Sequence, residues 1–144
     1  MNTKAIYPIA SIFALSLALG ACNKPEAPAK TEADLMRATA EGQAKVTEAT
    51  SEAVSEHLEN AADAREEGKP LSPSDLKTDV DNLHTVDTTL ADARYKVAKE
   101  QCDALTGDQK DGCLKSAETL HEVELGQAKA DQKSAKAAIT ENAK

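Results

Sequence analysis

Aromatic residues are scarce in this sequence. It has no tryptophan and only three aromatic residues in 144, namely Tyr7, Phe13 and Tyr95. Large aliphatic residues are also few, because Leu, Ile, Val and Phe together make up 17 of the 123 residues from Cys22 onward. So few large apolar side chains exclude a thick hydrophobic core and argue against a deep ligand pocket.

Positive charge is also in short supply. The chain has 17 Lys and Arg against 25 Asp and Glu, which gives a formal net charge of -8. Neutralising a phosphate backbone needs an excess of cations, so we expect no nucleic-acid partner. The acidic chain also gains nothing from anionic lipid head groups, so any attachment to a membrane depends on something other than charge.

Catalytic motifs are missing. No glycine-rich phosphate loop, nucleophile elbow or zinc-protease motif occurs along the chain. We therefore expect a protein that is not an enzyme, with no catalytic residue, no metal ligand and no cofactor.

The first 22 residues do carry a recognisable pattern. A short start containing Lys4 precedes an apolar run over residues 5–19, which is typical of a secretory signal peptide and is shorter than a membrane span. The segment Leu19-Gly20-Ala21-Cys22 that follows resembles the lipobox of bacterial lipoprotein precursors. We therefore expect a signal peptide over residues 1–21.

The resemblance implies that Cys22 becomes the new N-terminus and carries lipid. Two or three acyl chains anchor a protein stably, because each buried methylene contributes roughly 0.8 kcal/mol. In such lipoproteins an Asp directly after the lipidated cysteine tends to mark retention in the inner membrane, whereas Asn23 stands here. The implied location is the periplasmic face of the outer membrane, with the inner membrane as the weaker alternative.

The remaining chain is rich in strong helix formers and reads as all-α. Gly68 is typical of the end of a helix and Ser72 of the start of the next one. Gly107 and Asp108 predict a second break between helices, with Asp108 as the N-cap of the third helix. Leucine or valine recurs every seven residues in the second helix, which is coiled-coil spacing. The expected segments are an extended tether over 22–30, a helix over 31–67, a linker over 68–72, and an elongated antiparallel hairpin within 73–144 whose helices cover about 73–105 and 108–142.

Two cysteines flank the second break. Once Cys22 is assigned to lipid, Cys102 and Cys113 remain as a pair, and export places them where disulfides persist. If they face each other across the hairpin, facing residues have numbers that add to 215. Residues 95–113 also resemble a motif of uncharacterised proteobacterial envelope proteins, which implies a disulfide-closed helical hairpin and no particular activity.

The first helix leaves two alternatives open. Its apolar stripe is thin, and Thr31 to Asp34 could form a capping box at its start. It either folds back with Leu58 near Leu83 and completes a three-helix bundle, or stays partly disordered.

Three functions are compatible with these features. The leading hypothesis is a non-enzymatic structural or interaction role in the cell envelope, in which helical faces contact an envelope protein or a second copy and lipid on Cys22 contacts the membrane. A metal- or small-ligand-handling protein that uses His57, His84 and His121 is the first alternative. The last is attachment to peptidoglycan through Lys144, since a lipidated cysteine with long helices and a terminal lysine resembles the major peptidoglycan-linked outer-membrane lipoprotein.

Overall fold

The computed structural model describes residues 27–143, and over this range the chain forms three helices and no strand. The all-α class predicted from the sequence is therefore confirmed. The signal peptide, Cys22 and Lys144 lie outside the described residues. The helices are α1 (Pro28–Glu66), α2 (Pro73–Cys102) and α3 (Gly107–Asn142).

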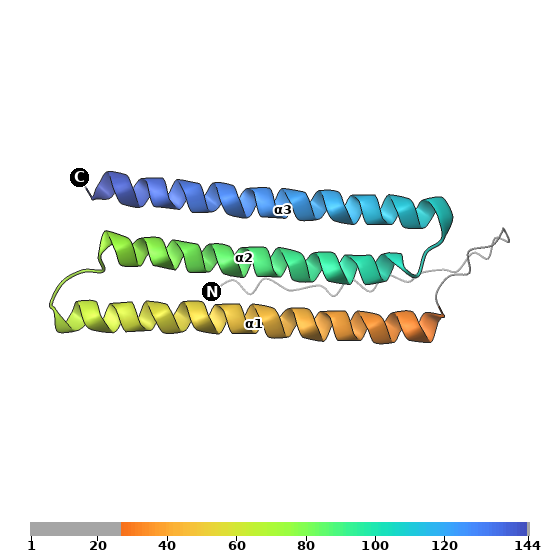
Figure 1. Cartoon of the computed structure of the whole chain (residues 1–144), viewed down its shortest axis with the longest axis horizontal. Helices are drawn as coiled ribbons and strands as arrows, with labels where there is room; N and C mark the ends of the chain where they lie inside the picture. The colour runs from red at the N-terminus through yellow and green to blue at the C-terminus, as the bar shows by residue number, and fades with distance from the viewer. Residues whose placement is uncertain (1–26, 144) are drawn as a thin grey trace, which may run out of the picture.

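The three helices lie side by side in a single layer, with α2 in the middle and antiparallel to both neighbours (Figure 1). Both α1 and α3 pack along α2, but within residues 27–143 they do not contact each other. The first helix thus folds back onto α2, as one alternative expected, while the closed three-helix bundle of that alternative does not form. Each outer helix carries one narrow stripe of small residues, which is enough for one neighbour.

Small side chains fill both seams between the helices. No large aliphatic or aromatic side chain within residues 27–143 is fully buried, and Cys102 is the largest that is. At the α1–α2 seam a Cβ atom added to Gly42 would lie 2.9 Å from the Cβ of Ala93, so the two backbones are close there. The buried residues are Ala38, Gly42, Ala91, Cys102, Ala117 and Ala128.

The hairpin of α2 and α3 has the register expected from its cysteines. Cys102 and Cys113 form a disulfide with their Cα atoms 5.6 Å apart, and Cys102 is completely buried. Further along the hairpin, the side chains that bond across the seam have residue numbers that add to nearly 215. Gln132 donates to Asp81 (sum 213) at 2.6 Å, and Arg94 donates to Glu124 (sum 218) at 3.0 Å.

The α1–α2 seam has polar links of its own. Asn82 donates to Glu56 at 2.8 Å, and Lys96 bonds to Glu41 near the other end of the seam. Leu58 and Leu83 line the same surface hollow, which confirms the expectation that they lie near each other.

The helix boundaries correct two expectations at the start of α1. This helix begins at Pro28, so residues 28–30 belong to the helix and not to the extended tether expected over 22–30. Proline is well tolerated at a first helical position because its missing N–H has no partner there in any case. Ala27 is the N-cap and gives no side-chain hydrogen bond, so the capping box expected at Thr31 is wrong.

The other boundaries match more closely. Ser72 is the N-cap of α2 and Gly68, with a φ of +64°, follows the end of α1, as their residue types suggested. Asp75, which the sequence reasoning did not name, completes a reciprocal capping box with Ser72. However, α2 ends at Cys102 rather than near residue 105. Thr106 rather than Asp108 is the N-cap of α3, so Asp108 lies in the first turn of that helix.

Candidate interaction surface

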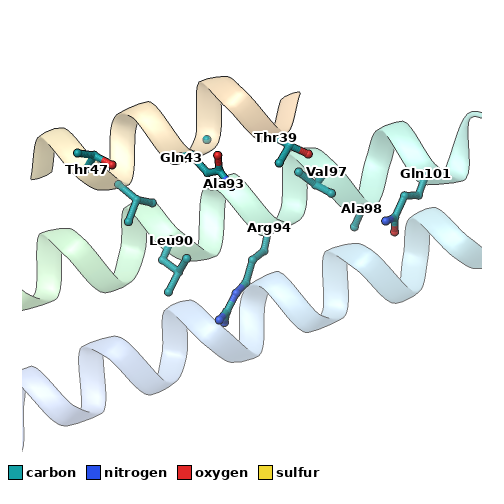
Figure 2. A pocket seen from close by; sticks show the side chains of 11 residues that line it. Thr39, Gln43, Thr47, Leu90, Ala93, Arg94, Val97, Ala98 and Gln101 are labelled. Carbon is teal, nitrogen blue, oxygen red and sulfur yellow. The ribbon is translucent and has the colours of Figure 1, made fainter. Parts of the chain in front are cut away.

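A hollow of about 530 Å³ opens along the seam between α1 and α2. Figure 2 shows it from close by, with Gln43 and Thr47 contributed by α1 and Leu90 and Val97 by α2. Arg94 is the only charged residue in its lining. The hollow is therefore an open and mainly uncharged groove.

A second hollow, of about 360 Å³, continues this groove along the same two helices. Its lining includes Val54 of α1 and Leu83 of α2. Residues seven apart lie on the same side of a helix, because seven residues make nearly two turns. Leu83, Leu90 and Val97 are spaced in this way, so the two hollows open on the same side of the layer.

The same side extends over α3. A smaller hollow between α2 and α3 is lined by Leu90 and Arg94, which also line the first hollow, and by Gln127 of α3. Three carboxylate side chains, Asp87, Glu124 and Asp131, line it as well. Leu120 and Val123 precede Gln127 by seven and four residues, a spacing that places them on the same side of α3. One face of all three helices is thus defined.

Most of the exposed large hydrophobic side chains gather on this face. Met36 and Leu76 belong to it because they precede Gln43 and Leu83 by two turns. Leu83 is 61% exposed and Val123 is 62% exposed, so these side chains are largely in water. We call this surface the apolar face. Its exposed large hydrophobic residues are Met36, Val54, Leu58, Leu76, Leu83, Leu120 and Val123. Among residues 27–143 one other large hydrophobic residue is exposed, Leu105, which lies in the turn after α2 and outside this face.

The opposite face of the layer is charged. On α2, Asp92 lies two residues after Leu90 and therefore points to the other side of the helix. Lys96 and Asp81 follow the same line as Asp92, and each bonds across a seam, Lys96 to Glu41 and Asp81 to Lys136 at 2.5 Å. We call this surface the charged face.

The cross-seam bonds change the acidity of two carboxyl groups. The hydrogen bond from Lys96, together with the charge of Lys96, lowers the pKa of Glu41. The hydrogen bond from Lys136 lowers the pKa of Asp81, and Gln132 adds a second hydrogen bond to the same group. One such carboxylate lies at each seam, so at each seam one cross-helix bond involves a carboxyl group whose ionised form is favoured.

The three histidines proposed as metal ligands lie apart. His57 bonds to Asp79 at 2.8 Å, and His121 bonds to Asp92 at 2.7 Å while its ring stacks on Tyr95 at 4.5 Å. The Nδ1 atom of His84 is buried without a hydrogen-bond partner. Among the described residues no three His, Cys, Asp or Glu side chains come together as a metal site requires.

Sequence reasoning missed part of the apolar face. It singled out the seven-residue repeat of α2 as a helix-packing line, but it did not connect this line with Leu120 and Val123. A signal was present: at a sum of 215 these residues fall opposite Tyr95 and Asp92, which offer no aliphatic partner. Two large aliphatic residues without a mate at the expected seam indicate an outward-facing side.

No helix in the described part of the chain combines the length and the apolar character that a membrane span requires. Compared with protein-family models, with curated proteins and with solved structures, the chain finds no match.

Proposed function

We propose that this protein is a lipid-anchored, non-enzymatic interaction protein of the bacterial cell envelope, which binds a helical protein surface through its apolar face. The observation that carries the proposal is the concentration of exposed large hydrophobic residues on one side of the layer. A contiguous patch of large apolar side chains exposed to water marks an interaction site.

The energetics favour a bound state for this face. Transferring one leucine side chain from water into an apolar contact contributes about 1.5–3 kcal/mol, and Leu58, Leu83 and Leu120 are each more than half exposed. The small residues at the seams leave the helices no interior in which to bury these side chains. A partner that covers the face supplies the missing burial.

The anchor is supported by the sequence around Cys22. The apolar run before it, the Leu19-Gly20-Ala21 segment and Asn23 favour lipidation and the periplasmic face of the outer membrane. Five residues, 23–27, separate Cys22 from α1. An extended chain spans at most about 3.6 Å per residue, so the helical layer begins within roughly 20 Å of the lipid.

Lipidation is tested by metabolic labelling with a palmitate analogue in cells that express the full chain. We expect label on the wild type and recovery with the outer membrane, and no label on Cys22→Ser. Asn23→Asp is the matched control, for which we expect label retained and a shift to the inner membrane. Equal labelling of wild type and Cys22→Ser would disprove the anchor.

The interaction face is tested by placing a photo-crosslinking amino acid at Leu83, on the apolar face, or at Thr85, an exposed residue of the charged face. We expect a protein adduct in cells from position 83 and none from position 85. The two positions belong to one helix, so they share its expression and folding. Adducts from neither position would contradict the proposed interaction role.

A further inference from the structure

The structure points to one occupant of the apolar face, and we propose that this occupant is a second copy of the same chain, packed face to face in a six-helix, two-layer dimer. This inference rests on the proposed function, because it names the partner of the same surface. Three features carry it: the extent of the face, its repeat and its charge.

The extent of the face excludes narrower occupants. A small ligand or a single helix could fill the groove between α1 and α2, but it would leave Leu120 and Val123 of α3 in water. A second three-helix layer covers all three helices at once. At 1.5 Å per residue α2 is about 45 Å long, and helix axes 8–10 Å apart make the face roughly 20 Å wide. The resulting area of roughly 900 Å² matches the 800 Å² or so that each partner contributes to a stable interface.

The repeat on α2 suits a copy of itself. Leu76, Leu83, Leu90 and Val97 follow one another at intervals of seven residues, which requires a partner helix with the same period. Consider two antiparallel α2 helices related by a two-fold axis next to Val86. Each leucine or valine of the line then meets another one, because Leu76 faces Val97 and Leu83 faces Leu90.

Charge selects the antiparallel arrangement. In the same register Arg94, which bonds to Glu124 within its own chain, faces Asp79 of the second copy, so opposite charges come together. In a parallel pair each Asp79 would face Asp79 and each Arg94 would face Arg94, and like charges at an interface are unfavourable. The charged face stays in water in both copies. The face between the copies still contains Arg94 together with the carboxylates Asp87, Glu124 and Asp131, which line the hollow between α2 and α3.

This pairing also places the two copies of Pro28 at opposite ends of the dimer. A dimer anchored through Cys22 of both copies therefore lies along the membrane rather than standing on it. The charged faces then form the two outer surfaces.

The oligomeric state is tested by sedimentation of the purified full-length lipidated protein in detergent. We expect twice the chain mass for the wild type and for the control Thr85→Glu, and the single mass for Leu83→Glu. Leu83 is 61% exposed in one copy, so this substitution is compatible with the fold of the monomer, which circular dichroism checks. A wild type of single mass at cellular concentrations overturns the inference.

Orientation and partner are tested in cells with the photo-crosslinker at Leu76. An antiparallel dimer gives an adduct of twice the chain mass in which position 76 is joined to the peptide around Val97. Adducts joining the two copies of position 76 overturn the antiparallel arrangement. If positions 76 and 83 form adducts with a different protein, self-association is wrong and the proposed interaction role stands. If neither position forms an adduct, both proposals are wrong.

Discussion

Gly42 lies at the α1–α2 seam, where a Cβ atom in its place would come within 2.9 Å of the Cβ of Ala93. The helix propensity of alanine is more favourable than that of glycine by about 1 kcal/mol, but overpacking a tight contact costs about 1–3 kcal/mol. The Ala93 methyl group has no rotamer by which to move away. We expect Gly42→Ala to lower the free energy of unfolding by about 1 kcal/mol, measured by urea denaturation.

Gly126 is the matched control for this prediction. It lies within α3, and a Cβ atom added there meets nothing within 4 Å. Without a clash the helix propensity acts alone, so Gly126→Ala should raise the free energy of unfolding by about 0.5–1 kcal/mol. If both substitutions stabilise the protein equally, the close approach of α1 and α2 is not as described.

Ser72 fixes the start of α2. Its side chain accepts a hydrogen bond from the backbone N–H of Asp75 at 3.2 Å, and its backbone N–H donates to the Asp75 carboxylate at 2.9 Å. We expect Ser72→Ala to cost about 1 kcal/mol of stability, as N-cap removal usually does. Ser74 does not serve as a control, because its hydroxyl lies 2.6 Å from that of Ser72. Ser51→Ala, at an exposed position inside α1, is the control and should cost less, so an equal loss in thermal denaturation for both variants would refute the capping role.

The helix ends also show how far residue types alone can predict local structure. Ser72 was predictable because a Ser-Pro start with an acid three residues from the cap satisfies the first turn from both sides. Thr31 carries similar signals but lies inside α1, since Pro28 already provides a first position with a suitable φ. Competing start signals only a few residues apart are not resolved by residue type.

At the scale of elements, the α2–α3 hairpin was predictable because one covalent bond fixes a point of its register. Once Cys102 meets Cys113, the antiparallel direction sets the other pairs to within a few residues, and the link between Asp81 and Gln132, whose numbers add to 213, lies close to this register. No such point exists for α1. Its small residues Ala38 and Gly42 do not fix which helix it packs against, so the sequence left open whether it completes a three-helix bundle or stays partly disordered.

The disulfide should carry a large share of the stability of this hairpin. It closes a loop of about 12 residues, for which the chain-entropy model predicts about 3 kcal/mol, and few large apolar contacts assist it. We expect the double substitution Cys102→Ser and Cys113→Ser to lower the free energy of unfolding by about that amount. Urea denaturation with and without reductant checks this, and reductant should leave the double variant unchanged.

A reductant that leaves the wild type as stable as before would contradict this prediction, provided mass spectrometry shows that the bond was reduced. The comparison also separates the bond from the side chains. The double variant and the reduced wild type lack the same bond but differ in the groups left at the seam.

For the whole molecule, the two faces of the layer explain what the sequence could and could not show about the candidate site. The repeat at Leu76, Leu83, Leu90 and Val97 was visible in the sequence as coiled-coil spacing, but the spacing alone does not show which side of α2 the line occupies. In the structure Leu90 and Val97 are half-buried and line the hollow between α1 and α2, whereas Leu76 and Leu83 are exposed. This difference depends on how α1 and α3 lie on either side of α2. Such an arrangement is set by all three helices together and cannot be read from one of them.

We expect acid to lower the free energy of unfolding, because each seam contains a carboxyl group whose pKa is lower in the folded chain. Glu41 is bonded by Lys96 at the α1–α2 seam, and Asp81 is bonded by Lys136 at the α2–α3 seam. A lowered pKa means that the folded chain holds a proton less readily than the unfolded chain. The resulting stability is present above the unfolded pKa of each group and is lost as the pH falls through the folded value.

We therefore expect the free energy of unfolding to be constant near neutral pH and to fall once the pH drops below the ordinary carboxyl range. The double substitution Glu41→Gln and Asp81→Asn removes both titrating groups, so it should be less stable than the wild type at pH 7 and less sensitive to acid. Glu118→Gln, an exposed position on α3, is the control that should keep the wild-type slope. Denaturation at constant ionic strength across this range measures all three slopes, and identical slopes for the wild type and the double variant would exclude these two carboxylates as the cause.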